Sequence, residues 1–546
     1  MQEGSSAVSG NIVDVVSGRI FPAMVLIAGG KIVGIREGRE RCSTYIVPGL
    51  VDAHVHIESS MLTPHEFARM ALTLGTLCAV CDPHEIANVL GMAGISYMLE
   101  NARTSPFMFS FGAPSCVPAT AFETSGAAIG PAEIRQLLEK KEISHLSEVM
   151  NYPGVLSRNP EVMAKIDLAK RLGKPIDGHA PGLRGDALKH YVAAGITTDH
   201  ETLSLEEAIE KIDNGMKILI REGSAAKDFE KLHSLIDSKS DMCMFCSDDM
   251  HPDDLAEGHM DKLVRMAIGY NHDPMKVLKC ACLNPVVHYG LPMGLLREGD
   301  PADFLVVDSL ENFTVLKTYI KGMLVAEEGK PLLEHVQPEI INAFHVGPKS
   351  TGEFAIRAGA GPANIIAAVD GQLITGWIRE SPGLRDGWAV SDPNRDIIKI
   401  AVVNRYHESP MAIGFIKGFG LKKGAIASSV AHDSHNIVAV GVTDDGICSA
   451  VNMVIENKGG LAVVCGELRE VLPLPIAGLM SDADAWEVAS RYSRIQGLVR
   501  GLGSLMSAPF ITLSFMALLV IPRLKLSDQG LFDAEDFIPI DVFAEH

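Results

Sequence analysis

Hydrophobic and polar positions change their pattern twice along the chain. Residues 10–45 hold short β-branched runs broken by Gly pairs and a Pro, a pattern that predicts strands joined by turns. From Ile46 to about Gly290, strand-like apolar runs alternate with helix-like segments, and this alternation is typical of a parallel sheet. About eight such units fit in that stretch, close to the ~250 residues usual for a (β/α)₈ barrel.

The β pattern returns after Leu291, in runs joined by Gly, Pro and Asp turns. We expect residues 291–345 to join residues 1–45 in one small composite β domain, built from both sides of a catalytic barrel at residues 46–290. Residues 346–546 are long enough for a C-terminal domain of their own. The predicted fold class is therefore α/β: a (β/α)₈ TIM-type barrel with a small composite β domain and a C-terminal α+β domain.

The C-terminal part contains strand-like runs and one clear helical segment. The runs IIKIAVVNRY, NIVAVGV and GGLAVVCGE predict strands, and DADAWEVASRYSRIQGLV predicts a helix. The longest strongly apolar run, residues 508–521, is too short to span a bilayer. Because it is apolar and bounded by Pro522, we expect buried core strands there.

The charge balance excludes some classes of function. Acidic residues number 68 and basic residues 48, so the net charge is −20 at neutral pH. This balance argues against a nucleic-acid partner or an anionic membrane surface. The polar N-terminus MQEGSSAVSG does not resemble a signal peptide, and ten cysteines in 546 residues are no disulfide framework. We therefore expect a protein of the reducing cytoplasm.

Two CxxC pairs, Cys78/Cys81 and Cys243/Cys246, invite comparison with a four-thiolate zinc site. Both pairs lie in strand-like apolar runs, where residues i and i+3 point to opposite faces. Such a pair does not easily hold one metal. We therefore expect buried cysteines.

Candidate chemistry begins with His54 and His56 in the run IVPGLVDAHVH, which is predicted to form one strand. Because residues i and i+2 of a strand share a face, both imidazoles point to one place. In a barrel the active site forms at the carboxyl ends of the strands. Two neutral imidazoles there suit a divalent metal.

Four further residues extend this pair into a constellation. Each ends a strand-like run before a Gly, Pro, Asn or acidic break: Glu148, His179, His200 and Asp248. If His54 and Asp248 belong to strands one and eight, the spacing assigns Glu148, His179 and His200 to strands four, five and six. A lone histidine at a strand end is more often a satisfied polar residue than a ligand. The convergence of all these residues favours a metal centre.

These residues and their neighbours resemble a known family. The His-x-His pattern, with the ligands that follow on later strands, is that of the amidohydrolase superfamily, and GLLREGDPADFLVVD after the barrel is similar to its flanking β domain. More narrowly, VPGLVDAHVHIESSMLTP, CDPHEIANV, SEVMN, DGHAPG and CSDD resemble the adenine deaminases. The resemblance continues through NRYHES, SSVAHDSHNIVAVG, GGLAVV and LMSDADAWEVA, so it spans nearly the whole chain.

The resemblance implies a site for two divalent metal ions. The residues of strands one and eight would hold one ion and the histidines of strands five and six the other, with Glu148 bridging. Many relatives carry a carboxylated Lys on strand four, and Glu148 is the variant seen in adenine deaminases. Manganese or iron is implied, and zinc is compatible with these ligands. The metal residues are His54, His56, Glu148, His179, His200 and Asp248.

The implied reaction hydrolyses adenine to hypoxanthine and ammonia with a metal-activated hydroxide. The hydroxide would attack C6 of adenine while Asp248 carries the proton to the ring and the leaving amine. Asp248 and Glu148 are therefore the candidate catalytic residues. Adenine is the expected small-molecule partner, and the family suggests a homodimer.

Weaker candidates for substrate binding follow the predicted strand ends, where substrate-facing loops arise. They are Glu58, His84, Glu85 and Glu201. They could contact the purine edge or a further metal, and ordinary loop polarity is the alternative explanation.

A dense polar cluster in the C-terminal part comprises His432, Asp433, His435 and Asn436 in the run AHDSHN. Another metal site is conceivable there. The favoured interpretation is a loop that packs near the barrel mouth or holds the domain interface.

Two alternative functions stay open. A cyclic amide hydrolase of the dihydroorotase or hydantoinase type would keep the fold, but such enzymes commonly carry the carboxylated Lys where Glu148 stands. A non-catalytic metal-binding barrel is the second alternative, and the full ligand set argues against it. Fold alone does not give the substrate, so the adenine prediction rests on motif resemblance.

Overall fold

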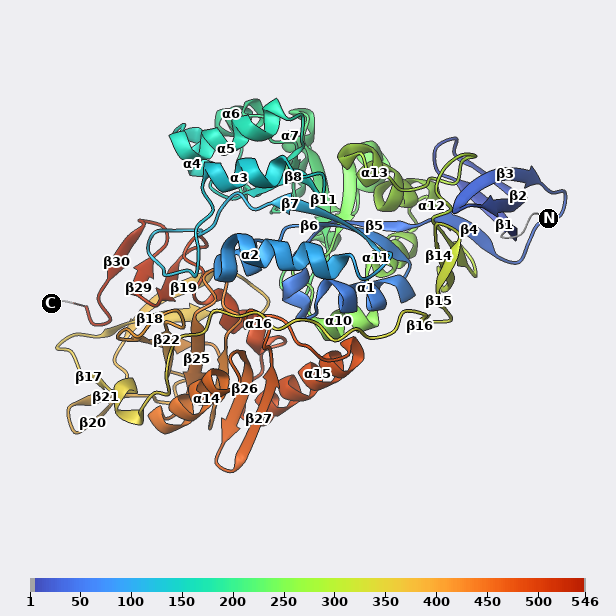
Figure 1. Cartoon of the computed structure of the whole chain (residues 1–546). Helices are drawn as coiled ribbons and strands as arrows, with labels where there is room; N and C mark the ends of the chain where they lie inside the picture. The colour runs from blue at the N-terminus through green and yellow to red at the C-terminus, as the bar shows by residue number, and fades with distance from the viewer. Residues whose placement is uncertain (1–4, 545–546) are drawn as a thin grey trace.

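The parallel strands of the chain form two curved sheets that lie edge to edge (Figure 1). The computed structural model describes residues 5–544. A five-stranded sheet has the order β5-β6-β7-β8-β9 and a three-stranded sheet the order β10-β11-β12. The strands are β5 (Leu50–Val55), β6 (Thr76–Cys81), β7 (Met108–Ala113), β8 (Ile143–Val149), β9 (Ile176–Gly178), β10 (Thr198–Asp199), β11 (Lys217–Arg221) and β12 (Cys243–Cys246).

Backbone hydrogen bonds link the two sheets at both junctions. At one junction, the amide of Asp248 donates to the carbonyl of His54 at 3.0 Å, and the amide of His56 donates to the carbonyl of Asp248 at 3.2 Å. At the other, the amide of Thr197 donates to the carbonyl of Ile176 at 2.9 Å. The eight parallel strands therefore lie side by side in chain order, and their carboxyl ends face the same region.

Helices follow the parallel strands and cover their outer side. Strands such as β6 are buried along their whole length, as expected for a parallel sheet covered on both faces. Thr63 caps the helix that begins at Pro64, a strong local start signal. The helices are α1 (Pro64–Thr73), α2 (His84–Ala102), α3 (Pro131–Leu138), α4 (Tyr152–Leu156), α5 (Pro160–Arg171), α6 (Gly185–Ala193), α7 (Leu205–Asp213), α8 (Phe229–Leu232), α9 (Leu235–Lys239), α10 (Pro252–Glu257), α11 (Met260–Gly269), α12 (Pro274–Leu278) and α13 (Asn284–Tyr289).

Strands from both sides of this region share one mainly antiparallel sheet at the right of Figure 1, with the order β16-β15-β14-β13-β4-β1-β2-β3. Its strands are β1 (Ser5–Asp14), β2 (Arg19–Ala28), β3 (Lys31–Glu37), β4 (Tyr45–Pro48), β13 (Phe304–Val307), β14 (Val315–Ile320), β15 (Met323–Glu327) and β16 (Lys330–Pro331).

The prediction of one strand through IVPGLVDAHVH is wrong. The segment breaks at Gly49 into β4, which pairs with β1 and β13, and β5, which starts the parallel sheet. A Cβ at Gly49 would lie 2.5 Å from a methyl carbon of Leu77, so a larger residue would require the Leu77 side chain on β6 to shift. The apolar pattern is continuous across the break and could not reveal it.

The C-terminal part is built on a second large sheet, with the order β19-β18-β23-β22-β25-β24-β26-β27. Two small sheets, β17-β21-β20 and β28-β29-β30, flank it. The strands are β17 (Ile356–Arg357), β18 (Ala363–Ala368), β19 (Thr375–Glu380), β20 (Gly383–Arg385), β21 (Trp388–Val390), β22 (Ile398–Val403), β23 (Ala412–Lys417), β24 (Ala425–Ser428), β25 (Ile437–Gly441), β26 (Gly460–Cys465), β27 (Leu468–Pro473), β28 (Leu524–Ser527), β29 (Gly530–Asp533) and β30 (Ile538–Ile540).

Three helices accompany this sheet: α14 (Asp444–Glu456), α15 (Ala485–Gly501) and α16 (Pro509–Phe515). The helix predicted from DADAWEVASRYSRIQGLV is confirmed as α15. The core strands predicted at 508–521 are wrong, because this run forms α16 and turns. Every residue of α16 is buried, so its sequence has no polar face, and short apolar runs of this kind do not separate strand from helix.

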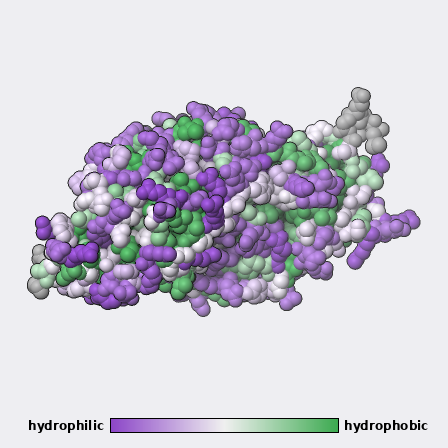
Figure 2. Space-filling model, turned by 90° about the horizontal axis from the view of Figure 1, so that it is seen from below, coloured by the Kyte–Doolittle hydropathy of each residue, from purple (hydrophilic) through white to green (hydrophobic). Residues whose placement is uncertain are grey.

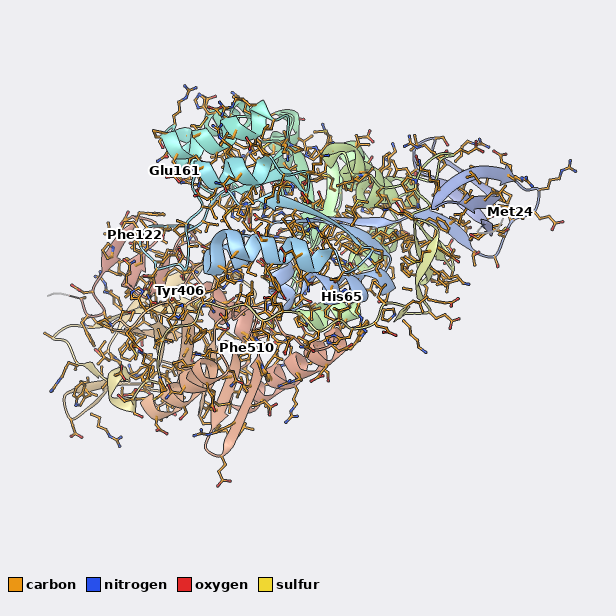
Figure 3. All side chains as sticks on the ribbon, viewed as in Figure 1. Met24, His65, Phe122, Glu161, Tyr406 and Phe510 are labelled. Atoms are coloured by element: carbon orange, nitrogen blue, oxygen red, sulfur yellow. The ribbon has the colours of Figure 1, made fainter. Side chains whose placement is uncertain are left out.

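The C-terminal part docks on loops that leave the parallel strands. Phe122, labelled in Figure 3, belongs to the loop after β7, and its ring lies 4.9 Å from the ring of Phe532. Ser527 donates its hydroxyl hydrogen to the carbonyl of Phe122 at 2.8 Å, and the amide of Thr124 donates to Asp528 at 2.9 Å. The C-terminal strands are therefore held beside the carboxyl ends of the parallel strands.

The four CxxC cysteines are buried in β6 and β12, as the strand pattern predicted. None of the helices within residues 5–544 combines the length and apolarity that crossing a membrane requires. On the face seen in Figure 2, hydrophilic side chains predominate and hydrophobic ones form smaller patches among them.

Candidate active site

The six predicted metal residues lie together at the carboxyl ends of the parallel strands. His54 is near the end of β5, and His56 follows it. Glu148 is the penultimate residue of β8, and Asp248 lies two residues beyond β12. His179 and His200 directly follow β9 and β10. The strand assignment made from spacing is therefore confirmed, because these strands are the first, fourth, fifth, sixth and eighth of the parallel set.

His54, His56 and Asp248 form the first group. The Nε2 atoms of the two histidines lie 3.2 Å apart. Asp248 Oδ1 lies 3.4 Å from His54 Nε2 and 3.2 Å from His56 Nε2. All three side chains are buried. One carboxylate oxygen and two imidazole nitrogens therefore face a common point.

Glu148 lies between this group and a second pair of histidines. Its Oε1 is 3.4 Å from His56 Nε2. Its Oε2 is 2.7 Å from His179 Nδ1 and 3.2 Å from His200 Nε2. The two oxygens of one carboxylate thus face different histidine groups, the arrangement that a bridging ligand needs.

The charges at the site favour ionised carboxylates. Burial opposes the ionisation of Glu148, but nearby His179 holds the pKa of Glu148 well below its usual range. Burial likewise opposes the ionisation of Asp248, and the Arg221 guanidinium holds the pKa of Asp248 well below its usual range. Burial lowers the pKa of His54, which favours the neutral ring. Burial also opposes the protonation of His56, His179 and His200, but the nearby carboxylates raise the pKa of each ring. Anionic carboxylates and neutral imidazoles are the forms that bind cations, so a metal would displace the protons of these three rings.

This donor set fits divalent cations. Several groups of His, Asp and Glu place their ligand atoms within 4.8 Å of one another. Beside them, both carboxylate oxygens of Asp82 are buried without a hydrogen bond among the described residues, and Oδ2 lies 3.2 Å from His84 Nδ1. Buried acceptors without hydrogen bonds are costly unless positive charge compensates them. His56 donates from Nδ1 to the backbone carbonyl of Asp82 at 3.1 Å, which leaves Nε2 for a metal.

Comparison with known proteins supplies the family. The amidohydrolase family profile matches residues 45–325, and the profile of the adenine deaminase C-terminal domain matches residues 372–538. The chain is 54% identical over 543 residues to an adenine deaminase of Salinibacter ruber, covering 99% of both chains. It is 56% identical over 532 residues to an adenine deaminase of a Sulfurovum species, covering 97% of this chain and 98% of the other.

The chain belongs to the adenine deaminase family of amidohydrolases. Membership implies a divalent metal ion, and the residue groups described above are candidate ligands for it. The resemblance read from the sequence motifs is thereby confirmed over nearly the full length.

The adenine deaminase site includes three of the four residues predicted to contact substrate. His84, Glu85 and Glu201 line the cavity at the strand ends. His84 Nδ1 lies 3.4 Å from Glu148 Oε1. Glu58 is absent from this lining. It accepts a hydrogen bond from the amide of Ile86 at 3.1 Å, and burial raises the pKa of Glu58 to about 7.

Arg221 is a charged residue of the site that the sequence analysis missed. It ends β11, the seventh parallel strand, and donates to Asp248 Oδ2 at 2.7 Å. The same guanidinium donates to both oxygens of Glu201, at 2.5 and 3.0 Å. Because it is buried, water does not compete for these hydrogen bonds. A strand-end position after the apolar run ILI was the signal that could have identified it.

The cavity over these residues is small and has two chemically different halves. Its polar half comes from the parallel strand ends, and its apolar half comes from Leu373, Phe515, Leu518, Val520 and Ile521. The enclosed space is about 40 Å³, room for a few water molecules. The C-terminal part therefore covers the site in this closed structure, and substrate entry requires the cover to move.

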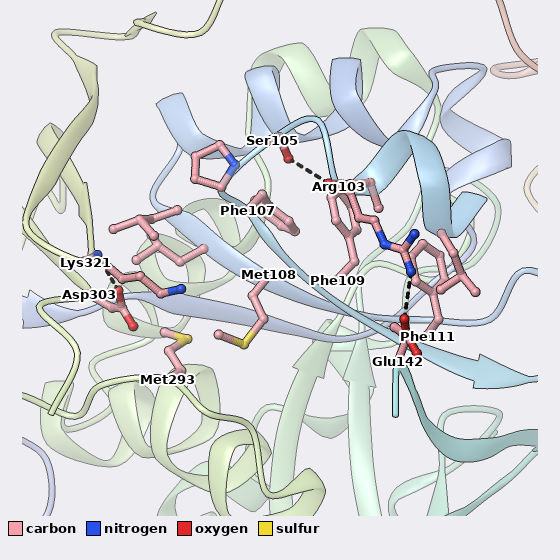
Figure 4. A pocket seen from close by; sticks show the side chains of 15 residues that line it. Arg103, Ser105, Phe107, Met108, Phe109, Phe111, Glu142, Met293, Asp303 and Lys321 are labelled. Atoms are coloured by element: carbon pink, nitrogen blue, oxygen red, sulfur yellow. Dashed lines mark hydrogen bonds and ion pairs between the residues drawn. The ribbon is translucent and has the colours of Figure 1, made fainter. Parts of the chain in front are cut away.

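A larger cavity of about 300 Å³ lies at the opposite, amino ends of β6 and β7 (Figure 4). Three of its four charged side chains, those of Arg103, Glu142 and Asp303, already have partners. Arg103 pairs with Glu142 at 2.7 Å, and Asp303 accepts a hydrogen bond from the amide of Lys321 at 2.7 Å. The amino ends of barrel strands serve stability rather than chemistry, so this cavity does not compete as the active site.

Proposed function

We propose that this chain hydrolyses adenine to hypoxanthine and ammonia at the carboxyl ends of its parallel strands. The observation that carries the proposal is the near-full-length identity with adenine deaminases, in a chain whose six predicted metal residues meet at one place. The apolar half of the cavity suits a flat purine ring, and the polar half suits its amino edge.

We also propose the architecture behind this site. The parallel strands would form a (β/α)₈ barrel across residues 46–290, supported by the hydrogen bonds that link its two sheets. Residues 1–45 and 291–345 would form the composite β domain, with β4 placing its boundary nearer Gly49. Residues 346–546 would form the C-terminal domain, and a homodimer is the proposed assembly.

Two divalent ions, manganese or iron with zinc as the alternative, are the proposed cofactors. The proposed ligands are His54, His56 and Asp248 for one ion and His179 and His200 for the other, with Glu148 between them. Bound there, the ions would lower the pKa of a coordinated water.

The side chains supply the remaining chemistry. Asp248 would accept one proton from the attacking water and deliver it to a ring nitrogen of the purine. It would then carry the second proton, from the new C6 hydroxyl, to the departing amine, so that ammonia leaves and the oxygen stays on C6. Arg221 would hold Asp248 Oδ2 and orient the carboxylate. Glu148 would keep His179 and His200 in place and anionic charge at the centre of the site. His84, Glu85 and Glu201, which line the cavity, stay proposed substrate-side residues, whereas Glu58 does not line it.

The test is ammonia release from adenine by protein reconstituted with manganese or iron, with adenosine and dihydroorotate assayed in parallel. We expect turnover of adenine alone. Turnover of dihydroorotate instead would support the cyclic amide alternative, and two bound metals without any turnover would support a non-catalytic barrel. Glu148 at the strand-four position opposes the cyclic amide alternative, and the full ligand set opposes the non-catalytic barrel.

A further inference from the structure

We propose that His432, supplied by the C-terminal part of the chain, binds the substrate by donating a hydrogen bond from Nε2 to a ring nitrogen of the purine, and that Glu85 and His435 position it. This inference rests on the proposed adenine deaminase activity and adds a specificity-determining residue to it.

The three residues form one buried array across the interface between the parallel strands and the C-terminal part. Glu85 stands in the first turn of α2, just beyond β6. His432 Nδ1 donates to Glu85 Oε1 at 2.5 Å, and His435 Nε2 donates to Glu85 Oε2. Glu85 is 2% exposed, His432 4% and His435 0%. One carboxylate from α2 therefore fixes two imidazoles from a loop far along the chain.

The hydrogen bonding of His435 argues against a metal within this array. The backbone amide of Ala431 donates to His435 Nδ1 at 3.2 Å, so Nδ1 must carry a lone pair. The proton of the neutral ring is then on Nε2, where it donates to Glu85. A nitrogen that carries a proton does not ligate a metal. The array therefore supports His432 through hydrogen bonds, and both Glu85 oxygens already accept a hydrogen bond from an imidazole.

Of the two imidazoles in the array, His432 is the one that lines the active-site cavity, together with His84 and Glu148. Its ring stacks on Phe515, with centroids 4.5 Å apart and planes 14° apart. Within residues 5–544, its hydrogen bond is made through Nδ1, which leaves Nε2 for a ligand.

The charge state of His432 suits a donor at Nε2. Burial disfavours the protonated ring, but the adjacent Glu85 carboxylate raises the pKa of His432 to about 9. With Nδ1–H engaged by Glu85, the second proton of the ring lies on Nε2. The unprotonated ring nitrogens of a purine are acceptors for such a donor, and Phe515 beside it offers an apolar face to the ring.

The loop that carries His432 is fixed on both sides. Asn436 donates to the carbonyl of Thr124, in the loop after β7, at 2.9 Å. The Tyr406 hydroxyl donates to the carbonyl of Ser434 at 2.5 Å. This support makes the loop a preformed part of the site, because neither contact depends on a bound ligand.

The experiment compares adenine with 1-deaza-, 3-deaza- and 7-deazaadenine as competing ligands of the metal-loaded wild type and of His432→Gln and His432→Leu. One deaza analogue should bind wild type about tenfold or more weakly than adenine, because it lacks the acceptor nitrogen. In His432→Leu the same analogue and adenine should bind equally, with KM for adenine raised more than kcat is lowered. Glu85→Gln should show a smaller loss in the same direction.

Metal content and melting temperature are measured alongside, with His345→Gln as the matched control, since His345 is exposed in the same part of the chain. We expect all variants to retain the wild-type metal content. Two results would overturn the inference: loss of metal from His432→Gln, or a His432→Leu variant that still distinguishes adenine from its deaza analogues as wild type does. In either case an active wild type leaves the proposed function standing. An inactive wild type overturns both.

Discussion

Arg221 donates a hydrogen bond to Asp248 Oδ2 at 2.7 Å, while Asp248 Oδ1 faces the ring nitrogens of His54 and His56. The two oxygens of this carboxylate are thereby given different partners. The pairing fixes the plane of the carboxylate and keeps it anionic, which is what a metal ligand and proton acceptor requires.

Replacing Arg221 by Lys should impair catalysis more than binding. Lysine keeps the charge but cannot hold Glu201 through two parallel hydrogen bonds while also reaching Asp248. We expect kcat for adenine to fall by about tenfold or more with a smaller change in KM. Steady-state kinetics measures this, and Lys189→Arg, at an exposed ion pair with Asp186 on α6, is the control. Unchanged kcat in Arg221→Lys contradicts a positioning role.

Asp248→Asn should abolish turnover while the fold persists. The amide keeps the shape of the side chain but cannot accept and return the proton, and general acid–base groups contribute about 10²–10⁴-fold to rate. Ammonia release and thermal melting together test this. A variant with intact metal and near-wild-type kcat would remove Asp248 from the proton path.

Adenosine should be a poor substrate compared with adenine. Leu518, Val520 and Ile521 enclose the site, and about 40 Å³ is free in the closed state. A ribose on the base would prevent this cover from closing, so water would not be excluded during the reaction. We expect kcat/KM for adenosine to be at least about 100-fold below that for adenine. Comparable values for both would show that the cover does not select against N9 substituents.

Glu123 should make stability depend on pH. It lies in the loop after β7, where burial and the nearby Asp433 carboxylate raise its pKa from 4.5 to about 8. Below pH 4.5 the side chain is protonated in both states. As pH rises toward 8, the unfolded chain ionises first, so the folded state loses stability across that window.

The variant Glu123→Gln should escape this loss. Its melting temperature should match wild type near pH 4.5 and exceed it progressively up to about pH 8, where the difference levels off. Thermal melts across that range give the measurement. A difference that does not change with pH would show that Glu123 ionises in the folded protein as it does in the unfolded chain.

The ligands could be predicted because the parallel fold makes strand ends converge. Glu148, His179 and Asp248 are far apart in sequence, but each ends a buried run, and period-two geometry alone brought His54 and His56 to one face. Spacing then assigned the strands. These inferences needed no knowledge of side-chain contacts.

Other features depend on tertiary contacts that no local pattern records. The break at Gly49 follows from the close approach of Leu77. A helix at Pro509–Phe515 replaces the expected strands, because a helix buried on all sides shows no helical period of polar and apolar residues. Arg221 sits at a strand end, but its role comes from carboxylates on three other segments. The contact of His432 with Glu85 joins two segments that are 347 residues apart in the sequence.

The most direct test of the central claim is ammonia release from adenine by metal-free protein titrated with manganese or iron, in wild type and Glu148→Gln. The account predicts that wild-type activity saturates at two metal ions per chain and that Glu148→Gln, which lacks the bridging anion, binds fewer ions and shows no turnover. Full activity of Glu148→Gln, or of wild type without added metal and with none bound, would contradict it.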